Sequence, residues 1–245
     1  MIIWLDVYSS AVSDTHGNFD FLPYFCEENH TDYQDILVIL GDAGLLYYGE
    51  NKAREKYLKK HVAEQPITII CVRGNHEDRP KNRSKMEVVT ICQKEMVGTF
   101  YYEPEYNSIF YAIDGESYVL QNKTCFVVGG AYSVDKWYRI QMGWQWFCDE
   151  ELTDKEMTEV LINCHGKTYD HIFSHTCPFD WEPTDLFLPT IDQNTVSKRM
   201  EHFLTKVANN CHWGEWWFGH FHADRMDVCG DGKVHMLFNQ VEEIV

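Results

Sequence analysis

The chain has 245 residues, of which 44% are apolar and 24% are charged, and these ordinary globular values exclude a wholly disordered protein. Its 21 Lys and Arg against 38 Asp and Glu give a formal net charge of −17. Such a field repels phosphate backbones and anionic lipid, so we expect neither extended nucleic-acid binding nor a membrane partner.

Short apolar runs alternate with helical patterns along the chain. The runs are rich in Ile, Val and Phe and too short for helices, so they predict buried strands at 35–40, 67–72, 124–128 and 171–173. Helices are predicted at 52–64, 154–163 and 202–209, the second preceded by a capping box of Thr153 and Glu156. This alternation indicates an α/β protein, and the absence of repeats and linkers favours one domain over 1–245.

Polar and imidazole side chains follow these runs closely. Asp14 and His16 lie two residues apart, and Gly41-Asp42 directly follows the run that ends at Leu40. The other members of this set are Asn75, His76, His175, His220 and His222. Because loops at the carboxyl ends of strands converge on one crevice, we expect these side chains to form a single site.

The chemistry of this set suits a divalent transition metal. Imidazole and carboxylate ligands bind ions such as Zn, Mn or Fe, and no thiolate belongs to the set. Each motif alone has an ordinary explanation, since Gly-Asp after a strand is common turn chemistry. Their combination at successive strand ends favours the metal-site interpretation, and the adjacent Gly17, Gly41, Gly74 and Gly219 permit tight turns and close backbone approach.

The order of these motifs resembles that of the calcineurin-like metallophosphoesterase superfamily. The matching series, over residues 14–222, is Asp14-x-His16, Gly41-Asp42, Gly74-Asn75-His76-Glu77, His175 and Gly219-His220-x-His222. The resemblance implies a four-layer α/β/β/α sandwich of two mixed sheets flanked by helices. It also implies a dinuclear metal centre at the carboxyl ends of the strands.

The same resemblance implies a role for each residue. Asp14, His16 and His222 would hold one ion, and Asn75, His175 and His220 the other. Asp42 would bridge the two, which suits a carboxylate with two oxygens. His76 would be the catalytic residue, acting as general acid or charge stabiliser without binding metal. Two Mn²⁺ ions are the expected cofactors, with Fe, Zn, Ni or Co as alternatives. A hydroxide that bridges the two ions would attack the phosphorus.

One part of the pattern departs from the phosphoprotein phosphatases. The segment 72–77 resembles theirs, and Arg73 is a candidate bidentate clamp for phosphate. Those enzymes read Gly-Asp-x-x-Asp-Arg-Gly where this chain reads Gly-Asp-Ala-Gly-Leu-Leu-Tyr over 41–47. The missing Asp and Arg argue against a serine/threonine phosphatase.

An aromatic segment spans 129–146 and extends to about residue 150. It is either a core or lid that packs on itself, or a substrate-facing wall. In the second case its Tyr and Trp side chains would stack a ring and its basic side chains would meet a phosphate. The candidate substrate-binding residues are therefore Arg73, Tyr132, Trp137 and Arg139.

We therefore expect a metal-dependent phosphoesterase that hydrolyses phosphomonoesters or phosphodiesters of small-molecule or nucleotide size. A protein phosphatase is an alternative weakened by the missing Asp and Arg. A non-catalytic scaffold of the same fold is a second alternative, weakened because all seven metal positions and His76 are filled.

Nine dispersed cysteines without a C-x-x-C pair indicate free thiols in a reducing cytosol. The opening, residues 1–12, lacks a basic region and contains Asp6, which is untypical of a signal peptide. The sequence thus predicts a cytoplasmic protein.

Overall fold

A computed structural model describes residues 9–230 and 232–244, so most of the opening segment 1–12 lies outside the described residues. The helices are α1 (Leu22–Asn29), α2 (Ala53–Ala63), α3 (Lys136–Met142), α4 (Asp154–Cys164) and α5 (Arg199–Ala208). The strands are β1 (Ser9–Val12), β2 (Ile36–Ile39), β3 (Thr68–Cys71), β4 (Glu87–Cys92), β5 (Met96–Tyr102), β6 (Ile109–Ala112), β7 (Ser117–Leu120), β8 (Lys123–Val128), β9 (Thr168–Ser174), β10 (His212–Phe218), β11 (Arg225–Cys229), β12 (Gly232–Met236) and β13 (Glu242–Glu243).

The predicted elements are present. The four expected strands are β2, β3, β8 and β9, and the three expected helices are α2, α4 and α5. The capping box of α4 is confirmed, because Thr153 Oγ1 accepts from the Glu156 backbone while Glu156 Oε2 accepts from the Thr153 backbone at 2.8 Å. Helix α3, inside the aromatic segment, carries no periodic apolar pattern and was not predicted from the sequence.

The described strands form one mixed sheet in the order β11-β12-β10-β9-β8-β7-β5-β6-β3-β2-β1-β13, with β4 paired to β5. It contains two parallel blocks, β1-β2-β3-β6 and β8-β9-β10-β12. We expected two separate sheets, but the antiparallel pairing of β5 with β7 continues the hydrogen-bond ladder from one block to the other. The α/β class is confirmed, as a single large curled sheet with helices.

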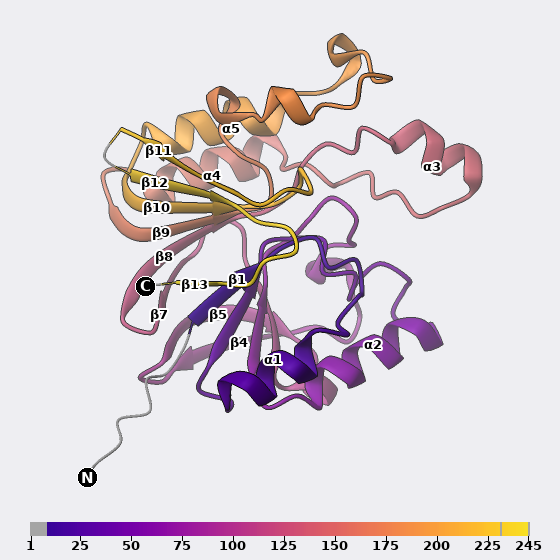
Figure 1. Ribbon diagram of the computed structural model, residues 1–245, viewed down its shortest axis with the longest axis vertical. Helices are drawn as coiled ribbons and strands as arrows, with labels where there is room; N and C mark the ends of the chain where they lie inside the picture. Colours follow the sequence, from indigo (N-terminus) through magenta and orange to yellow (C-terminus); the bar gives the residue numbers. More distant parts are fainter. Residues whose placement is uncertain (1–8, 231, 245) are drawn as a thin grey trace.

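Helices cover the outer side of each block, and a core lies between the blocks. Helices α1 and α2 lie on one side of the molecule, and α4 and α5 on the other (Figure 1). Strand β2 shows why its apolar run is continuous. Ile36 and Val38 pack in the core between the blocks, while Leu37 and Ile39 pack toward the α2 side, as the two-residue period of a strand requires.

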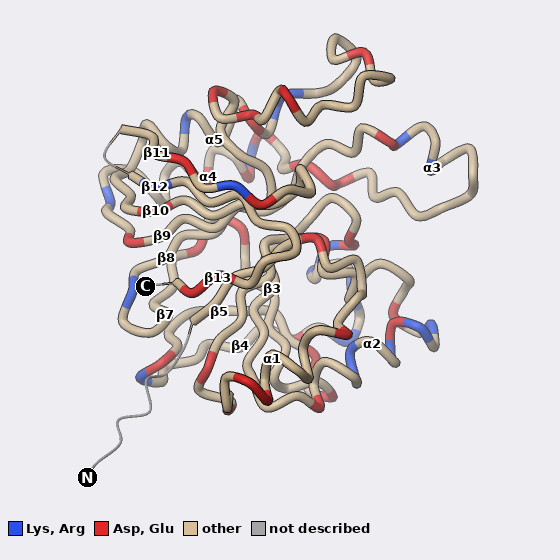
Figure 2. Tube along the Cα trace, viewed as in Figure 1, with Lys and Arg blue, Asp and Glu red and all other residues tan. Residues whose placement is uncertain are grey.

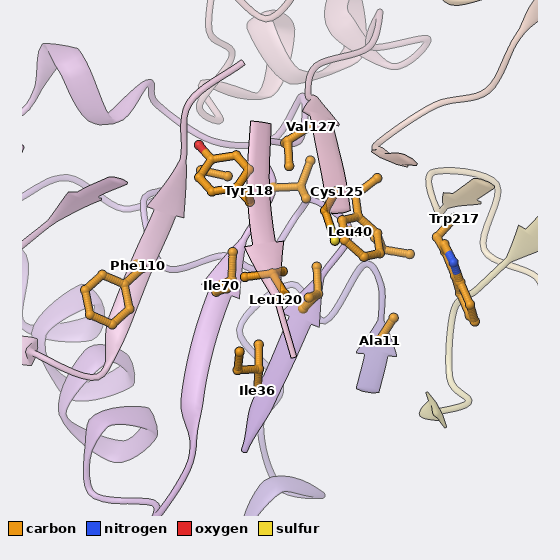
Figure 3. Packing of buried hydrophobic residues seen from close by; sticks show 14 of the residues in the cluster. Ala11, Ile36, Leu40, Ile70, Phe110, Tyr118, Leu120, Cys125, Val127 and Trp217 are labelled. Carbon is orange, nitrogen blue, oxygen red and sulfur yellow. The ribbon is translucent and has the colours of Figure 1, made fainter. Parts of the chain in front are cut away.

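The central core joins strands that are distant in sequence. Ala11 and Ile36 from the first block lie in one cluster with Val127 and Trp217 from the second (Figure 3). This packing holds the two parallel blocks against each other. The loops that follow their strands therefore have a fixed relative position.

Charged side chains of both signs and free thiols are distributed along the chain. Lys and Arg positions are scattered among those of Asp and Glu along the trace (Figure 2). All nine cysteines are free thiols, as expected. Within 9–230 and 232–244, no helix has the length and apolar character that crossing a bilayer demands.

Candidate metal centre

The loops at the candidate site hold strained backbone. Eight non-glycine residues in the described ranges have positive φ, and five of them belong to the predicted metal set. These five are Asp14, His16, Asp42, His220 and His222, with φ between 47° and 69°. The left-handed region is unfavourable for such residues and persists only where the surroundings impose it, which is typical of functional sites.

Two glycines allow the loops to approach closely. A Cβ at Gly74 would lie 1.9 Å from Asp42 Oδ1, and one at Gly219 would lie 1.7 Å from Ser13 Oγ. No side chain fits at either position without displacing its neighbours. These glycines let the loops after β3 and β10 contact those after β2 and β1.

The first cluster of donor atoms consists of Asp14, His16 and His222. The Nε2 atoms of the two histidines are 3.3 Å apart, and Asp14 Oδ1 lies 3.5 Å from His222 Nε2. Asp14 Oδ2 accepts from Ser13 Oγ at 2.6 Å and from the His220 backbone at 2.8 Å. Its buried Oδ1 has no hydrogen-bond partner among the described residues. A free carboxylate oxygen and two imidazole nitrogens thus converge.

Electrostatics keep Asp14 ionised. Burial alone would raise its pKa, but the 3.5 Å contact of Oδ1 with His222 Nε2 and positive charge on His175 outweigh burial and leave the pKa below its ordinary value. The same contact raises the pKa of His222. A carboxylate that remains charged when buried is suited to bind a cation.

The second cluster centres on His175 and Asn75. His175 Nδ1 lies 2.8 Å from the Leu40 carbonyl oxygen, which can only accept, so Nδ1 carries the proton. Asn75 Nδ2 donates to Ser133 Oγ at 2.8 Å, so the amide oxygen of Asn75 faces the ring. That Oδ1 atom is 2.8 Å from His175 Nε2.

When the His175 ring is neutral, its Nε2 and the Asn75 Oδ1 atom are both acceptors, and they face each other with no proton between them. Asp42 Oδ2 lies 3.7 Å from the same Nε2 atom. Burial opposes ionisation of Asp42, yet the charges of His76, His175 and His16 hold its pKa well below the ordinary value. Nitrogen and oxygen lone pairs beside a buried carboxylate fit a divalent transition metal.

Asp14 and Asp42 both lie between the clusters. Donor atoms of Asp14, Asp42 and His175 lie within 4.8 Å of one another, so Asp14 belongs to both groups. The His220 ring lies beside this group, with its centroid 4.9 Å from the centroid of the His175 ring. Burial, reinforced by His175, lowers the pKa of His220 to about 3, so its ring stays neutral as a ligand must.

His76 lies at the edge of these groups rather than within them. Its backbone N–H donates to Asp42 Oδ1 at 2.8 Å, and its Nε2 lies 3.7 Å from Asp42 Oδ2 and 3.4 Å from an Arg139 nitrogen. Burial lowers the pKa of His76, Asp42 opposes this effect, and Arg139 adds to it. The imidazole is therefore neutral near pH 7 and partly open to solvent.

Two recesses flank His76. The larger, of about 340 Å³, is lined by His76, Asn75, His220 and His222 on the side of the centre and by the segment 182–198 on the other. The smaller, of about 200 Å³, is lined by His16, His76 and Arg139 among others. A molecule in either recess would contact the donor clusters.

Comparison with known proteins decides the family. The sequence model of the calcineurin-like phosphoesterases matches residues 11–226 of this chain. The chain belongs to that family. A crystal structure of a phosphopantetheinyl hydrolase from Mycobacterium tuberculosis shares the fold, with a TM-score of 0.51, 12% identity, and coverage of 99% of this chain and 97% of that one. No curated protein matches the sequence.

Arg73 of this phosphoesterase does not reach the centre. Its guanidinium is buried and donates to Asp114 Oδ2 at 3.0 Å, to the Glu150 carbonyl at 2.6 Å and to the Gly129 carbonyl at 3.1 Å. These bonds occupy all three of its nitrogens, which leaves no free fork for the phosphate contact suggested by the sequence. Arg73 instead ties the loop after β3 to the aromatic segment.

We expect Arg73→Met to destabilise the fold by about 3–5 kcal/mol, because it leaves the buried partners of the guanidinium unpaired. Chemical denaturation monitored by tryptophan fluorescence measures this change in the free energy of unfolding. Arg225→Met, which breaks the exposed pair with Asp185, is the matched control and should leave the denaturation midpoint in place. Equal midpoints for wild type and Arg73→Met would contradict the structural role.

The other three candidate substrate-binding residues differ in whether they line a recess beside the centre. Tyr132 lines the larger recess and Arg139 the smaller one. Trp137 is 71% exposed on α3, which extends away from the body of the phosphoesterase (Figure 1), and it lines neither recess. The aromatic segment is therefore only in part adjacent to the centre.

Sequence reasoning missed two features of the site. One is a relay behind Asn75, in which Ser133 Oγ donates to Glu150 Oε2 at 2.5 Å and Trp146 Nε1 donates to the same oxygen at 2.9 Å. The other is the wall at 182–198, signalled only by several apolar residues in an otherwise polar loop. Neither feature has a motif that would identify it without the tertiary structure.

Proposed function

We propose that this phosphoesterase uses two divalent transition-metal ions, Mn²⁺ by preference, to hydrolyse small phosphomonoesters or phosphodiesters. One observation carries the proposal. His175 Nε2 and Asn75 Oδ1 face each other at 2.8 Å, and when the His175 ring is neutral the hydrogen bonds to Leu40 and Ser133 leave each atom with a lone pair directed at the other. A cation bound between the two atoms would accept both lone pairs.

The donor clusters support the ligand assignment suggested by the family resemblance. Asp14, His16 and His222 would hold one ion, and Asn75, His175 and His220 the other. Asp42 lies beside the second group and would be shared, and the position of Asp14 in both groups makes it a second carboxylate at the junction. When bound, the ions would supply an activated water nucleophile and neutralise phosphoryl oxygens.

The chain's own residues would do the remaining work. His76 stands outside the ligand clusters, so its imidazole can donate a hydrogen bond to a phosphoryl oxygen when neutral and, in its imidazolium form, can give a proton to the leaving oxygen. The Asp42 carboxylate fixes the His76 backbone, and Arg139 adds positive charge beside the imidazole. The relay through Ser133 and Glu150 orients the Asn75 amide.

We infer that residues 1–245 form a single domain in the cytoplasm. We also propose that the curled sheet serves as the two inner layers of a four-layer α/β/β/α arrangement, supported by separate apolar clusters between the blocks and under each pair of helices.

The proposed function is tested by metal content and turnover. Protein purified with excess Mn²⁺ should carry two ions per chain by mass spectrometry and should hydrolyse 4-nitrophenyl phosphate or its bis-ester. Removal of the ions with a chelator should abolish turnover, and Mn²⁺ should restore it. A stoichiometry of one or zero would contradict the dinuclear assignment, and full activity after chelation would contradict metal dependence.

A further inference from the structure

The larger recess beside the centre has an apolar wall. This wall comes from the segment 182–198, which extends from the body of the molecule in Figure 1, and includes Leu186, Phe187, Ile191 and Val196. Leu186 and Leu188, both in this lining, are 36% and 58% exposed. Apolar side chains that remain accessible beside a reaction centre gain free energy when a ligand covers them.

The same recess offers no cation for a second anionic group. Lys198 is the only Lys or Arg among the described residues that line it. Its ammonium is 2.6 Å from Glu182 Oε1 and 4.4 Å from the centre of the Phe187 ring, so its charge is already paired. Asp135 and Glu201 also line the recess, and neither supplies a cation; the Asp135 carboxylate is itself paired with Arg139 Nε at 2.6 Å.

Glu201 is a buried carboxyl in the lining of the recess. It is 4% exposed, its Oε1 accepts from Thr176 Oγ1 at 2.9 Å, and its Oε2 has no partner among the described residues. Burial raises the pKa of Glu201 to about 7. The ionised fraction of this carboxyl would repel an anion placed beside it.

On the basis of the proposed function, we propose that this recess receives the organic part of the substrate. It selects a phosphoester whose body is apolar and uncharged over nucleotides and other compounds that carry a second anionic group. The phosphate would lie at the donor clusters, and the apolar body would lie against the wall at 182–198. The recess of about 340 Å³ accommodates a body the size of a short alkyl chain or a ring.

Calorimetric titration with alkylphosphonates tests the inference without turnover. Methyl-, butyl- and hexylphosphonate share one head group, so Kd reports the alkyl chain alone. With the Mn²⁺-loaded protein, Kd should fall about threefold to fourfold for each methylene buried. Hexylphosphonate should bind at least about tenfold more tightly than 6-phosphonohexanoate, whose distal carboxylate would lose its hydration against the apolar wall without gaining a free cation.

Ile191→Ser and Leu186→Ser should flatten this dependence on chain length, since both residues belong to the wall. Ile162→Ser is the matched control, because Ile162 is 69% exposed on α4 and does not line the recess. It should reproduce the wild-type series. Two wall variants are used so that misfolding of one, detected by circular dichroism, does not remove the test.

The outcomes separate the inference from the function on which it rests. Equal Kd values along the series, or tighter binding of a nucleoside monophosphate than of hexylphosphonate, would overturn the inference while turnover of 4-nitrophenyl phosphate leaves the proposed function standing. A wild-type slope retained in both folded wall variants would also overturn it. Absence of phosphonate binding together with absence of turnover would overturn both.

Discussion

Asp42→Asn is expected to lose metal and to lower the turnover number by more than about 10²–10³-fold. The buried Asp42 carboxylate carries the charge between the donor clusters, with Oδ2 3.7 Å from both His76 Nε2 and His175 Nε2. Asparagine keeps the size of the side chain but removes the charge and one oxygen acceptor. Metal analysis by mass spectrometry and the rate of 4-nitrophenyl phosphate hydrolysis measure the two effects.

Asp185→Asn is the control for removal of one acidic charge, because Asp185 is exposed and pairs only with Arg225 in the described contacts. It should retain both ions and wild-type turnover. If Asp42→Asn kept two ions and normal turnover, the position of Asp42 between the two ions would be wrong.

His76→Ala is expected to retain both metal ions while turnover falls about 10²–10⁴-fold, the usual range for general acid–base catalysis. The reason is geometric, since His76 adjoins Asp42 without joining either donor cluster. The loss should be larger for alkyl phosphates than for 4-nitrophenyl phosphate, because a good leaving group departs without a proton.

His212→Ala supplies the comparison, since His212 is an exposed residue at the beginning of β10. It should not change turnover with either class of ester. Loss of metal from His76→Ala would show that the imidazole is a ligand. An equal loss of turnover for good and poor leaving groups would exclude the general-acid role and leave charge stabilisation.

Local sequence predicted four of the strands, three of the helices and the residues of the candidate metal set. Apolar runs such as 35–40 are continuous because the strand is buried on both faces, and the polar residue that follows each run occupies the loop at its carboxyl end. Asp42 and the two histidines of 220–222 are therefore recognisable from their neighbours along the chain alone. The structure brings these loops together, as the order of the motifs predicted.

Only the tertiary structure decided which atoms face each other. Arg73 adjoins the metal-set motif in sequence, yet its guanidinium turns to Asp114 and two distant carbonyls. The pairing of β5 with β7 joined two expected sheets into one. The segment 182–198 supplies the apolar wall of the larger recess, to which the aromatic segment contributes only Tyr132, Val134 and Asp135. Each of these outcomes depends on packing between residues far apart in the chain, and periodicity and spacing report only on neighbours along it.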